Sequence, residues 1–109
     1  MAETAERPYT VEERVTVAET DDLAVKRFTL AQGQEIPWHY HSRVSDTFFC
    51  LEGALVVETR APRYLHRVLT GESCAVPPMT AHRVSGLDGA RVRFLIVQGV
   101  GEYDYQPVG

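Results

Sequence analysis

Short segments with β-strand composition follow one another along the chain, and this pattern limits the fold more than any other feature. The segments are rich in β-branched and aromatic residues, and they read VEERVTVAE, LAVKRFTL, TFFCLEG, ALVVETR, YLHRVL, SCAVP, HRVSG and RVRFLIVQ. Gly, Pro, Asp or Ser residues separate them at intervals of roughly 8–12 residues, which is typical of a β-sandwich or β-barrel. The sequence therefore predicts an all-β fold with little helix.

The two segments at residues 25–30 and 91–98 alternate along their length. Every second side chain of a strand shares one face, so one face of the first segment carries Lys26, Phe28 and Leu30. One face of the second segment carries Val92, Phe94, Ile96 and Gln98. The opposite faces are also partly apolar, as in two packed sheets whose outer face is covered by another subunit or by the chain ends.

Length and charge narrow the classes of function. The 109 residues form a chain that buries roughly 65% of its unfolded surface, which suffices for one domain with one core. Asp and Glu number 15 against 11 Lys and Arg, and the basic residues are scattered, so nucleic-acid binding gains no support. No apolar run approaches the roughly 20 residues that span a bilayer, and no secretory signal pattern is present. We therefore predict a cytoplasmic protein with no membrane partner.

The N-terminal residues and the two cysteines carry weaker signals. Residues 1–10 are polar and contain Pro8, which predicts an N-terminal arm that is frayed or pairs as an edge strand with another subunit. Cys50 and Cys74 lack the short spacing of a metal site. We interpret them as buried apolar thiols, with a disulfide or a reactive thiol as the alternatives.

The stretch GQEIPWHYHSRVSDTFFCLEG, which begins at Gly33, carries the main chemical signal. In a β-strand His39 and His41 point to the same face, so their two imidazoles can share one ion. Gly33 permits a turn into this strand, and the residue before Pro37 is held extended. A hairpin after His41 would let Asp46 open the returning strand and bring its carboxylate back toward the histidines.

A second cluster starts with a turn at Gly71 and ends with PPMTAH. The double proline predicts a rigid loop, after which His82 begins a strand as the candidate fourth ligand. Three neutral imidazoles and one carboxylate suit one divalent transition metal, which these residue types leave open among Fe, Mn, Ni, Cu, Zn and Co. A lone histidine in a strand is more often a core or surface residue than a ligand, and we interpret His66 in this way.

The spacing of the two clusters resembles the motifs of the cupin superfamily, G-x5-H-x-H-x3-4-E-x6-G and G-x5-P-x-G-x2-H-x3-N. Five residues follow Gly33 before the histidine pair, four more lead to Asp46, and six more lead to Gly53. The run from Gly71 to His82 has the spacing of the second motif. This paired agreement makes the resemblance specific.

Three positions depart from the cupin pattern. Asp46 replaces the usual glutamate and is shorter by one C–C bond, about 1.5 Å. It would either bind the metal directly or hydrogen-bond a histidine ligand and hold its tautomer. Met79 stands where glycine is usual, which puts a left-handed turn in question and would place a thioether at the pocket mouth. Gly86 stands where asparagine is usual.

The resemblance implies that residues 11–109 form an antiparallel double-stranded β-helix, also called a jelly-roll barrel. The metal would lie inside the barrel near its wider mouth, and homodimers are common in the family. The ligands it implies are His39, His41, Asp46 and His82.

The same alternation predicts a substrate pocket beside the metal. Phe48 and Cys50 follow Asp46 at every second position, and Val84 follows His82 in the same way, so these residues and Met79 would line the pocket. The predicted lining residues are Arg27, Phe48, Cys50, Met79 and Val84. Arg27 would anchor an anionic substrate, the alternative being a solvated or ion-paired arginine.

An open-sided metal at the bottom of an apolar cup is suited to a small oxygen-bearing molecule. We expect a metal-dependent enzyme of dioxygenase type. The alternatives are an isomerase, lyase or decarboxylase that uses the metal as a Lewis acid, or a non-enzymatic small-molecule or metal-binding protein. Tyr103 and Tyr105 could reach the barrel mouth, but we interpret them as surface or dimer-interface residues.

Overall fold

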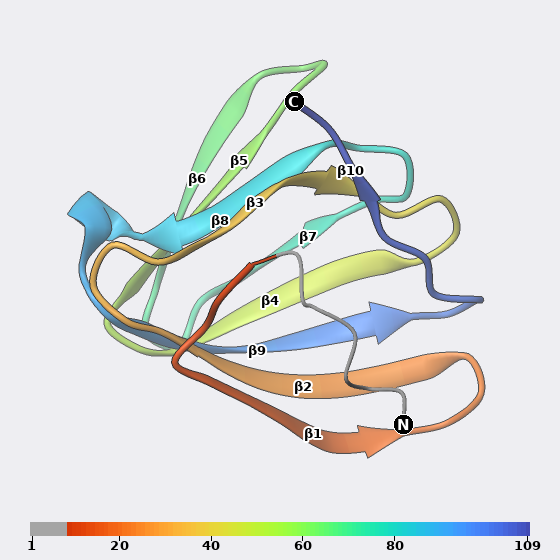
Figure 1. Ribbon diagram of the computed structural model, residues 1–109, viewed down its shortest axis with the longest axis horizontal. Helices are drawn as coiled ribbons and strands as arrows, with labels where there is room; N and C mark the ends of the chain where they lie inside the picture. Colours follow the sequence, from red (N-terminus) through yellow and green to blue (C-terminus); the bar gives the residue numbers. More distant parts are fainter. Residues whose placement is uncertain (1–8) are drawn as a thin grey trace.

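The computed structural model describes residues 9–109 and confirms the all-β prediction. Ten strands form two five-stranded antiparallel sheets that face one another (Figure 1). Within the described residues, helix is limited to the 3-10 turn η2 (Leu87–Gly89), and no helix there could cross a membrane. The predicted N-terminal arm, residues 1–10, falls almost wholly outside the described residues, so its pairing with another subunit stays a prediction.

Each sheet mixes early and late parts of the chain. The first sheet has the order β1 (Glu13–Glu19), β2 (Leu23–Leu30), β9 (Val92–Gly99), β4 (Ser45–Glu52) and β7 (Ser73–Val76). The second sheet has the order β10 (Gln106–Pro107), β3 (Glu35–Tyr40), β8 (His82–Gly86), β5 (Ala54–Thr59) and β6 (Tyr64–Leu69). Neighbouring strands are antiparallel throughout, as in a double-stranded β-helix. The eight strand-like segments of the sequence correspond to eight of these strands, β3 is the strand expected at His39, and the short β10 was not predicted.

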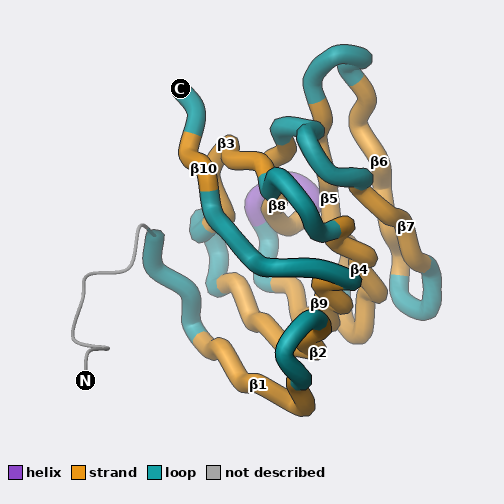
Figure 2. Tube along the Cα trace, turned by 90° about the vertical axis from the view of Figure 1, so that its right-hand side faces the viewer, coloured by secondary structure: helices purple, strands orange, loops and turns teal. Residues whose placement is uncertain are grey.

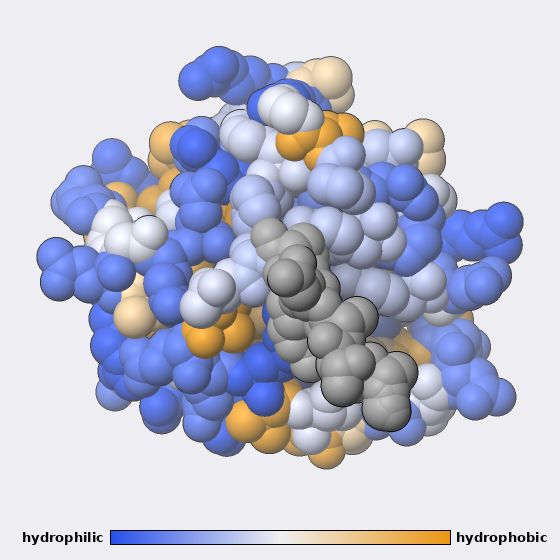
Figure 3. Space-filling model, in the orientation of Figure 1, coloured by the Kyte–Doolittle hydropathy of each residue, from blue (hydrophilic) through white to orange (hydrophobic). Residues whose placement is uncertain are grey.

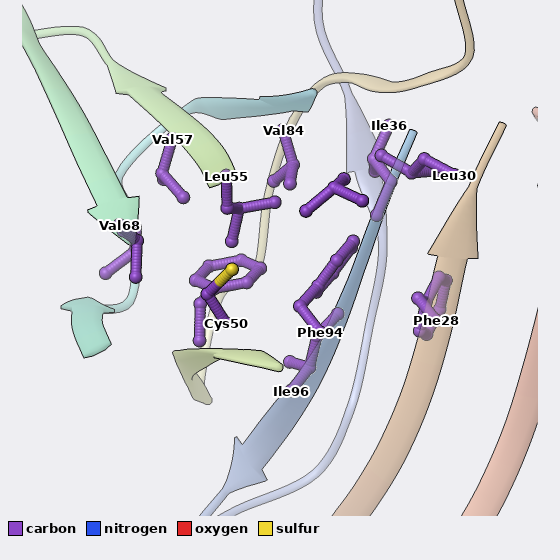
Figure 4. Packing of buried hydrophobic residues seen from close by; sticks show 13 residues of the cluster. Phe28, Leu30, Ile36, Cys50, Leu55, Val57, Val68, Val84, Phe94 and Ile96 are labelled. Carbon is purple, nitrogen blue, oxygen red and sulfur yellow. The ribbon is translucent and has the colours of Figure 1, made fainter. Parts of the chain in front are cut away.

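The core fills the space between the sheets because inward residues alternate with outward ones. Along β9 the buried positions are Val92, Phe94, Ile96 and Gln98. The rings of Phe28 and Phe94 stack with their centres 5.7 Å apart. Figure 4 shows these rings among the aliphatic side chains of both sheets. Burying each such side chain stabilises the fold by about 1.5–3 kcal/mol.

The C-terminal segment turns back over one end of the barrel. After β9 the chain crosses from the first sheet to the second, where β10 pairs with β3 (Figures 1 and 2). The backbone N–H of Val108 donates to the carbonyl of Trp38 and fixes the end of this crossing. On the face seen in Figure 3, hydrophilic residues predominate and apolar residues form separate patches.

Candidate metal centre

Three histidines converge from the second sheet because of strand register. His39 lies on β3 directly opposite His82 of β8, and His41 follows β3 on the same face as His39. The three side chains are buried, with exposures of 3%, 2% and 1% for His39, His41 and His82. The ring centres of His39 and His82 are 4.3 Å apart.

Asp46 reaches the same point from the first sheet. It is the second residue of β4, lies opposite Gln98 of β9, and is 2% exposed. Its Oδ2 atom lies 3.0 Å from Nε2 of both His41 and His82. Its Oδ1 atom accepts a hydrogen bond from Nε2 of Gln98 at 3.0 Å. The carboxylate is therefore held from behind and directed at the histidines.

Backbone carbonyls fix the orientation of each imidazole. Nδ1 of His39 donates to the carbonyl of Pro37 at 2.7 Å, and Nδ1 of His82 donates to that of Thr80 at 2.8 Å. Nδ1 of His41 donates to the carbonyl of Asp104 at 2.6 Å. With Nδ1 occupied in all three rings, each Nε2 can offer its lone pair to a metal ion.

Two of the contacts between these donors have the spacing expected around one transition-metal ion. One donor atom from each of the four residues lies within 4.8 Å of the others. Donors about 2.1 Å from an ion lie about 3.0 Å apart when they are at right angles, and about 3.4 Å apart in a tetrahedron. The two contacts of 3.0 Å made by Asp46 match such neighbouring positions. The group is a buried set of three histidines and one aspartate that could bind a metal.

The ionisation of the cluster also suits a cation. Burial, and next the neighbouring His82, lower the pKa of His39 to about 4, so this ring is neutral at pH 7. Burial raises the pKa of Asp46, but the hydrogen bonds from His41 and His82 outweigh it and hold this pKa well below its usual range. Burial lowers the pKa of His41, but the hydrogen bond and charge of Asp46 outweigh it and raise this pKa. A metal ion would take the place of the protons in these contacts.

A cavity of about 20 Å³ adjoins the cluster, which is room for little more than one water molecule. Among the predicted pocket residues, Phe48 and Val84 line this cavity. They continue the faces of Asp46 and His82, as the alternation of each strand requires. Both are buried and make this side of the cavity apolar.

Three predicted pocket residues lie elsewhere. Arg27 alternates with Phe28, so its side chain lies on the outer face of the first sheet, where it pairs with Glu13 at 3.5 Å. The thiol of Cys50 lies deeper in the core and donates to the carbonyl of Gly53 (Figure 4). Met79 is 67% exposed and does not line the cavity.

The loop around Met79 keeps its shape without the usual glycine. Met79 adopts a φ of 63°, in the left-handed region, and its N–H donates to the carbonyl of His41 at 2.8 Å. The position that the motif assigns to glycine therefore retains its left-handed turn. His66, interpreted as a non-ligand, lies on β6 with its ring 5.6 Å from that of Tyr64.

Five polar residues of the cavity were not predicted as site residues: Tyr9, Arg14, Lys26, Gln98 and Tyr103. Lys26 and Gln98 occupy inward positions of β2 and β9. A polar residue on an otherwise apolar strand face indicates a site, so the sequence alone could have pointed to both residues. Tyr103, interpreted as a surface or interface residue, is 48% exposed, and its ring centre also lies 5.1 Å from that of His41. The stacking of Tyr105 on His39 at 4.7 Å likewise comes from the C-terminal crossing.

The thiols are free and show no sign of activation. Cys50 and Cys74 form no disulfide. Burial raises the pKa of Cys74 to about 11 and also raises that of Cys50. A thiol with a raised pKa is a poor nucleophile at neutral pH. The interpretation as a buried apolar thiol therefore fits Cys50, whereas Cys74 is half-buried.

Comparison with known proteins gives one family and several similar structures. The family described as Cupin domain matches residues 26–98. A double-stranded beta-helix domain protein from Klebsiella pneumoniae has a TM-score of 0.75 and 22% identity, covering 94% of this chain and 90% of that one. A cupin-2 domain containing protein from Shewanella frigidimarina has a TM-score of 0.67 and 20% identity, with coverage of 81% and 80%.

An oxalate oxidase structure has a TM-score of 0.72 at 19% identity. The match covers 87% of this chain and 53% of that chain, so this chain spans about half of the enzyme's length. No protein among the curated sequences matches this chain. At these identities the structures establish the fold.

Proposed function

Because this chain belongs to the cupin family, whose domain matches residues 26–98, we propose that it is a metal-dependent cupin that acts on a small oxygen-bearing molecule. The ligands are His39, His41, Asp46 and His82. The observation that carries the proposal is the convergence of three imidazole Nε2 atoms and one carboxylate in a buried group beside a cavity. A metal held there would supply a Lewis acid and, with a redox-active ion, oxidation chemistry.

The residues around the ligands keep them in a binding geometry. Carbonyls of Pro37, Thr80 and Asp104 hold the three rings with Nε2 directed inward. Gln98 holds the Asp46 carboxylate. Such contacts behind the ligands reduce the reorganisation that metal binding requires and raise the basicity of the imidazoles. Phe48 excludes water from one side of the cavity.

We further propose that the reaction is oxidative. Among residues 9–109, the titratable residues that line this cavity outside the metal cluster are Tyr9, Arg14, Lys26 and Tyr103. Arginine, lysine and tyrosine side chains have ordinary pKa values of about 10 or above, and burial raises the pKa of Tyr103 further. A lining that offers no carboxylate or imidazole outside the metal cluster, within the described residues, suits a reaction with dioxygen at the metal better than one that begins with proton removal by a protein base. The structural likeness to an oxalate oxidase is consistent with this choice.

The experiment that tests the metal site is elemental analysis of protein purified without chelators or a metal-binding tag. We expect about one equivalent of a transition metal in the wild-type protein and a large loss in H39A, H41A and H82A. His66→Ala is the matched control, because His66 lies on β6 away from the cluster. Unchanged metal content in all three ligand variants would contradict the site.

Oxygen consumption by the loaded protein tests the oxidative proposal. Small hydroxy acids, keto acids, diketones and catechols are the compounds to supply, with product analysis for each. Turnover that consumes oxygen supports the proposal, and turnover of the same compounds without oxygen would replace it with a Lewis-acid reaction.

We also propose that the chain forms a homodimer through the outer face of the first sheet. Phe49 and Leu51 of β4 are 38% and 40% exposed there, and Leu95 lies beside Phe49 in the register. A second copy would bury these apolar side chains. Light scattering should give a dimeric mass for the wild-type protein and a monomeric mass for Phe49→Glu. A monomeric mass for the wild type would contradict the proposal.

A further inference from the structure

Arg14 forms part of the cavity wall although it comes from the edge strand β1. It lies directly opposite Phe28 of β2, so both side chains are on the inner face of the first sheet. Its guanidinium carbon is 4.9 Å from the centre of the Phe28 ring and 5.2 Å from that of Tyr9. Contact with ring faces holds a guanidinium while leaving the N–H groups in its plane available to an acceptor.

Two of the three guanidinium nitrogens of Arg14 are buried without a hydrogen-bond partner in the described structure. Neither Nε nor Nη2 has a hydrogen-bond partner within residues 9–109. A buried cationic donor without an acceptor is unfavourable. Arg27 differs in having a carboxylate partner, Glu13, although its Nε is also buried without a hydrogen bond, and Arg91, just before β9, pairs with Glu12. An anion bound in the cavity would supply the acceptor that Arg14 lacks.

The same cavity carries a second cation and an unused acceptor. Lys26 lies two residues before Phe28 on the inner face, with its ammonium nitrogen 5.0 Å from the centre of the Tyr103 ring. Gln98 donates to Asp46, while its Oε1 is buried without a partner among the described residues. The cavity thus combines the positive charges of Arg14 and Lys26 with one acceptor, Oε1 of Gln98, which is suited to a hydroxyl group of a ligand.

We propose that the ligand of this cavity is a small hydroxycarboxylic acid whose carboxylate binds the guanidinium of Arg14. The planar fork of an arginine matches the two oxygens of a carboxylate. The hydroxyl of the acid donates to Oε1 of Gln98, beside the metal cluster. The cavity of about 20 Å³ is smaller than even the smallest such acid, so the lining must shift on binding, and only an acid of a few non-hydrogen atoms is expected to fit. The inference rests on the proposed function for the metal-facing end of the ligand, whereas the Arg14 contact needs no metal.

The test is calorimetric titration of the full-length protein, with and without metal, using glycolate and its uncharged analogue glycolamide. We expect glycolate to bind more tightly than glycolamide in both forms of the protein. Arg14→Gln should weaken glycolate binding about tenfold or more and leave glycolamide unchanged, because only the charged ligand uses the guanidinium. Arg27→Gln is the matched control, since Arg27 lies on the outer face of the same sheet, and it should bind glycolate as the wild type does.

The outcomes separate this inference from the metal proposal. Equal glycolate affinity in wild type and R14Q, or no glycolate binding at all, overturns the inference whatever the metal content. Arg14-dependent binding to a protein that takes up no metal even after metal is supplied sustains the inference and removes the proposed function. If inorganic phosphate displaces glycolate and binds more tightly, the assignment of the ligand as a carboxylic acid is overturned. If circular dichroism shows that R14Q is unfolded, Arg14→Lys replaces it in the titration. Lysine keeps the positive charge but lacks the planar guanidinium, so we expect glycolate affinity to fall about threefold.

Discussion

Nδ1 of His41 donates a 2.6 Å hydrogen bond to the backbone carbonyl of Asp104, which joins the candidate metal centre to the C-terminal crossing. The Asp104 side chain strengthens this link, because its Oδ1 accepts from the N–H of Ser42 at 2.7 Å. Hydrogen bonds from Ser42 lower the pKa of the Asp104 carboxyl to about 2, so it is charged at neutral pH. A segment without motif residues therefore orients one of the four candidate ligands.

Asp104→Ala should weaken metal binding by several-fold without removing it. The substitution removes the acceptor of the Ser42 N–H, so the Asp104 carbonyl that accepts from Nδ1 of His41 is held less firmly. The His41 imidazole then populates both neutral tautomers instead of one. Chelator competition measures the affinity, and nitrogen NMR of the imidazole reports the tautomer. Glu102→Ala is the control, because Glu102 is exposed in the same segment and pairs only with Arg43 at 3.4 Å in the described structure. Equal effects of both variants would argue against the His41 contact.

Gln98→Leu should lower metal affinity by roughly 10- to 100-fold while the fold is retained. Gln98 is buried, and its amide is the donor that holds Oδ1 of Asp46 in place. Leucine fills a similar volume but offers no donor, so the carboxylate can rotate away from His41 and His82. Gln34→Leu provides a comparable change in the β2–β3 turn, away from the cluster. An unaltered affinity in Gln98→Leu would show that the amide does not position Asp46.

The fold and the ligand cluster were predictable because both depend on local spacing. Alternation with a period of two defined the strands, and it placed His39 and His41 on one face of one strand. The same rule argued against Arg27 as a pocket residue, since Arg27 alternates with the apolar Phe28 and must face outward. The contact with Glu13 agrees with the ion-paired alternative for Arg27.

Arg14 and Tyr103 reach the cavity through long-range contacts that no local sequence pattern predicts. Arg14 enters the site because β1 adds to the sheet edge in a register that sets it opposite Phe28. Tyr103 enters because the C-terminal segment crosses the barrel end after β9 (Figure 2). Both placements are results of long-range packing. Lys26 and Gln98, by contrast, broke an apolar inward pattern and could have been found.

Gly86→Ala should destabilise the protein by about 1–3 kcal/mol, as overpacking does. A Cβ atom on Gly86 would lie 1.7 Å from the carbonyl oxygen of Ala90, so the turn after β8 must move to accept it. This close approach explains glycine where the cupin motif has asparagine. Thermal unfolding measures the change, with Ser85→Ala on the same strand as control. A melting temperature equal to that of the wild type would show that the turn yields without cost.

The stability of the metal-free protein should fall as the pH decreases from 6.5 toward 4, because of His39. Burial, and next His82, lower the pKa of this ring from 6.5 to about 4 in the folded protein. Above pH 6.5 the ring is neutral in both states, but below it only the unfolded chain takes up the proton, so the free energy of unfolding decreases. At pH 5 the loss is about 2 kcal/mol for a difference of roughly 1.5 pH units. Urea unfolding of wild type and H39Q at pH 7 and pH 5 measures it. Because glutamine cannot be protonated in this range, the pH dependence of H39Q should be smaller by that amount, and an identical dependence in both proteins would contradict the assignment to His39.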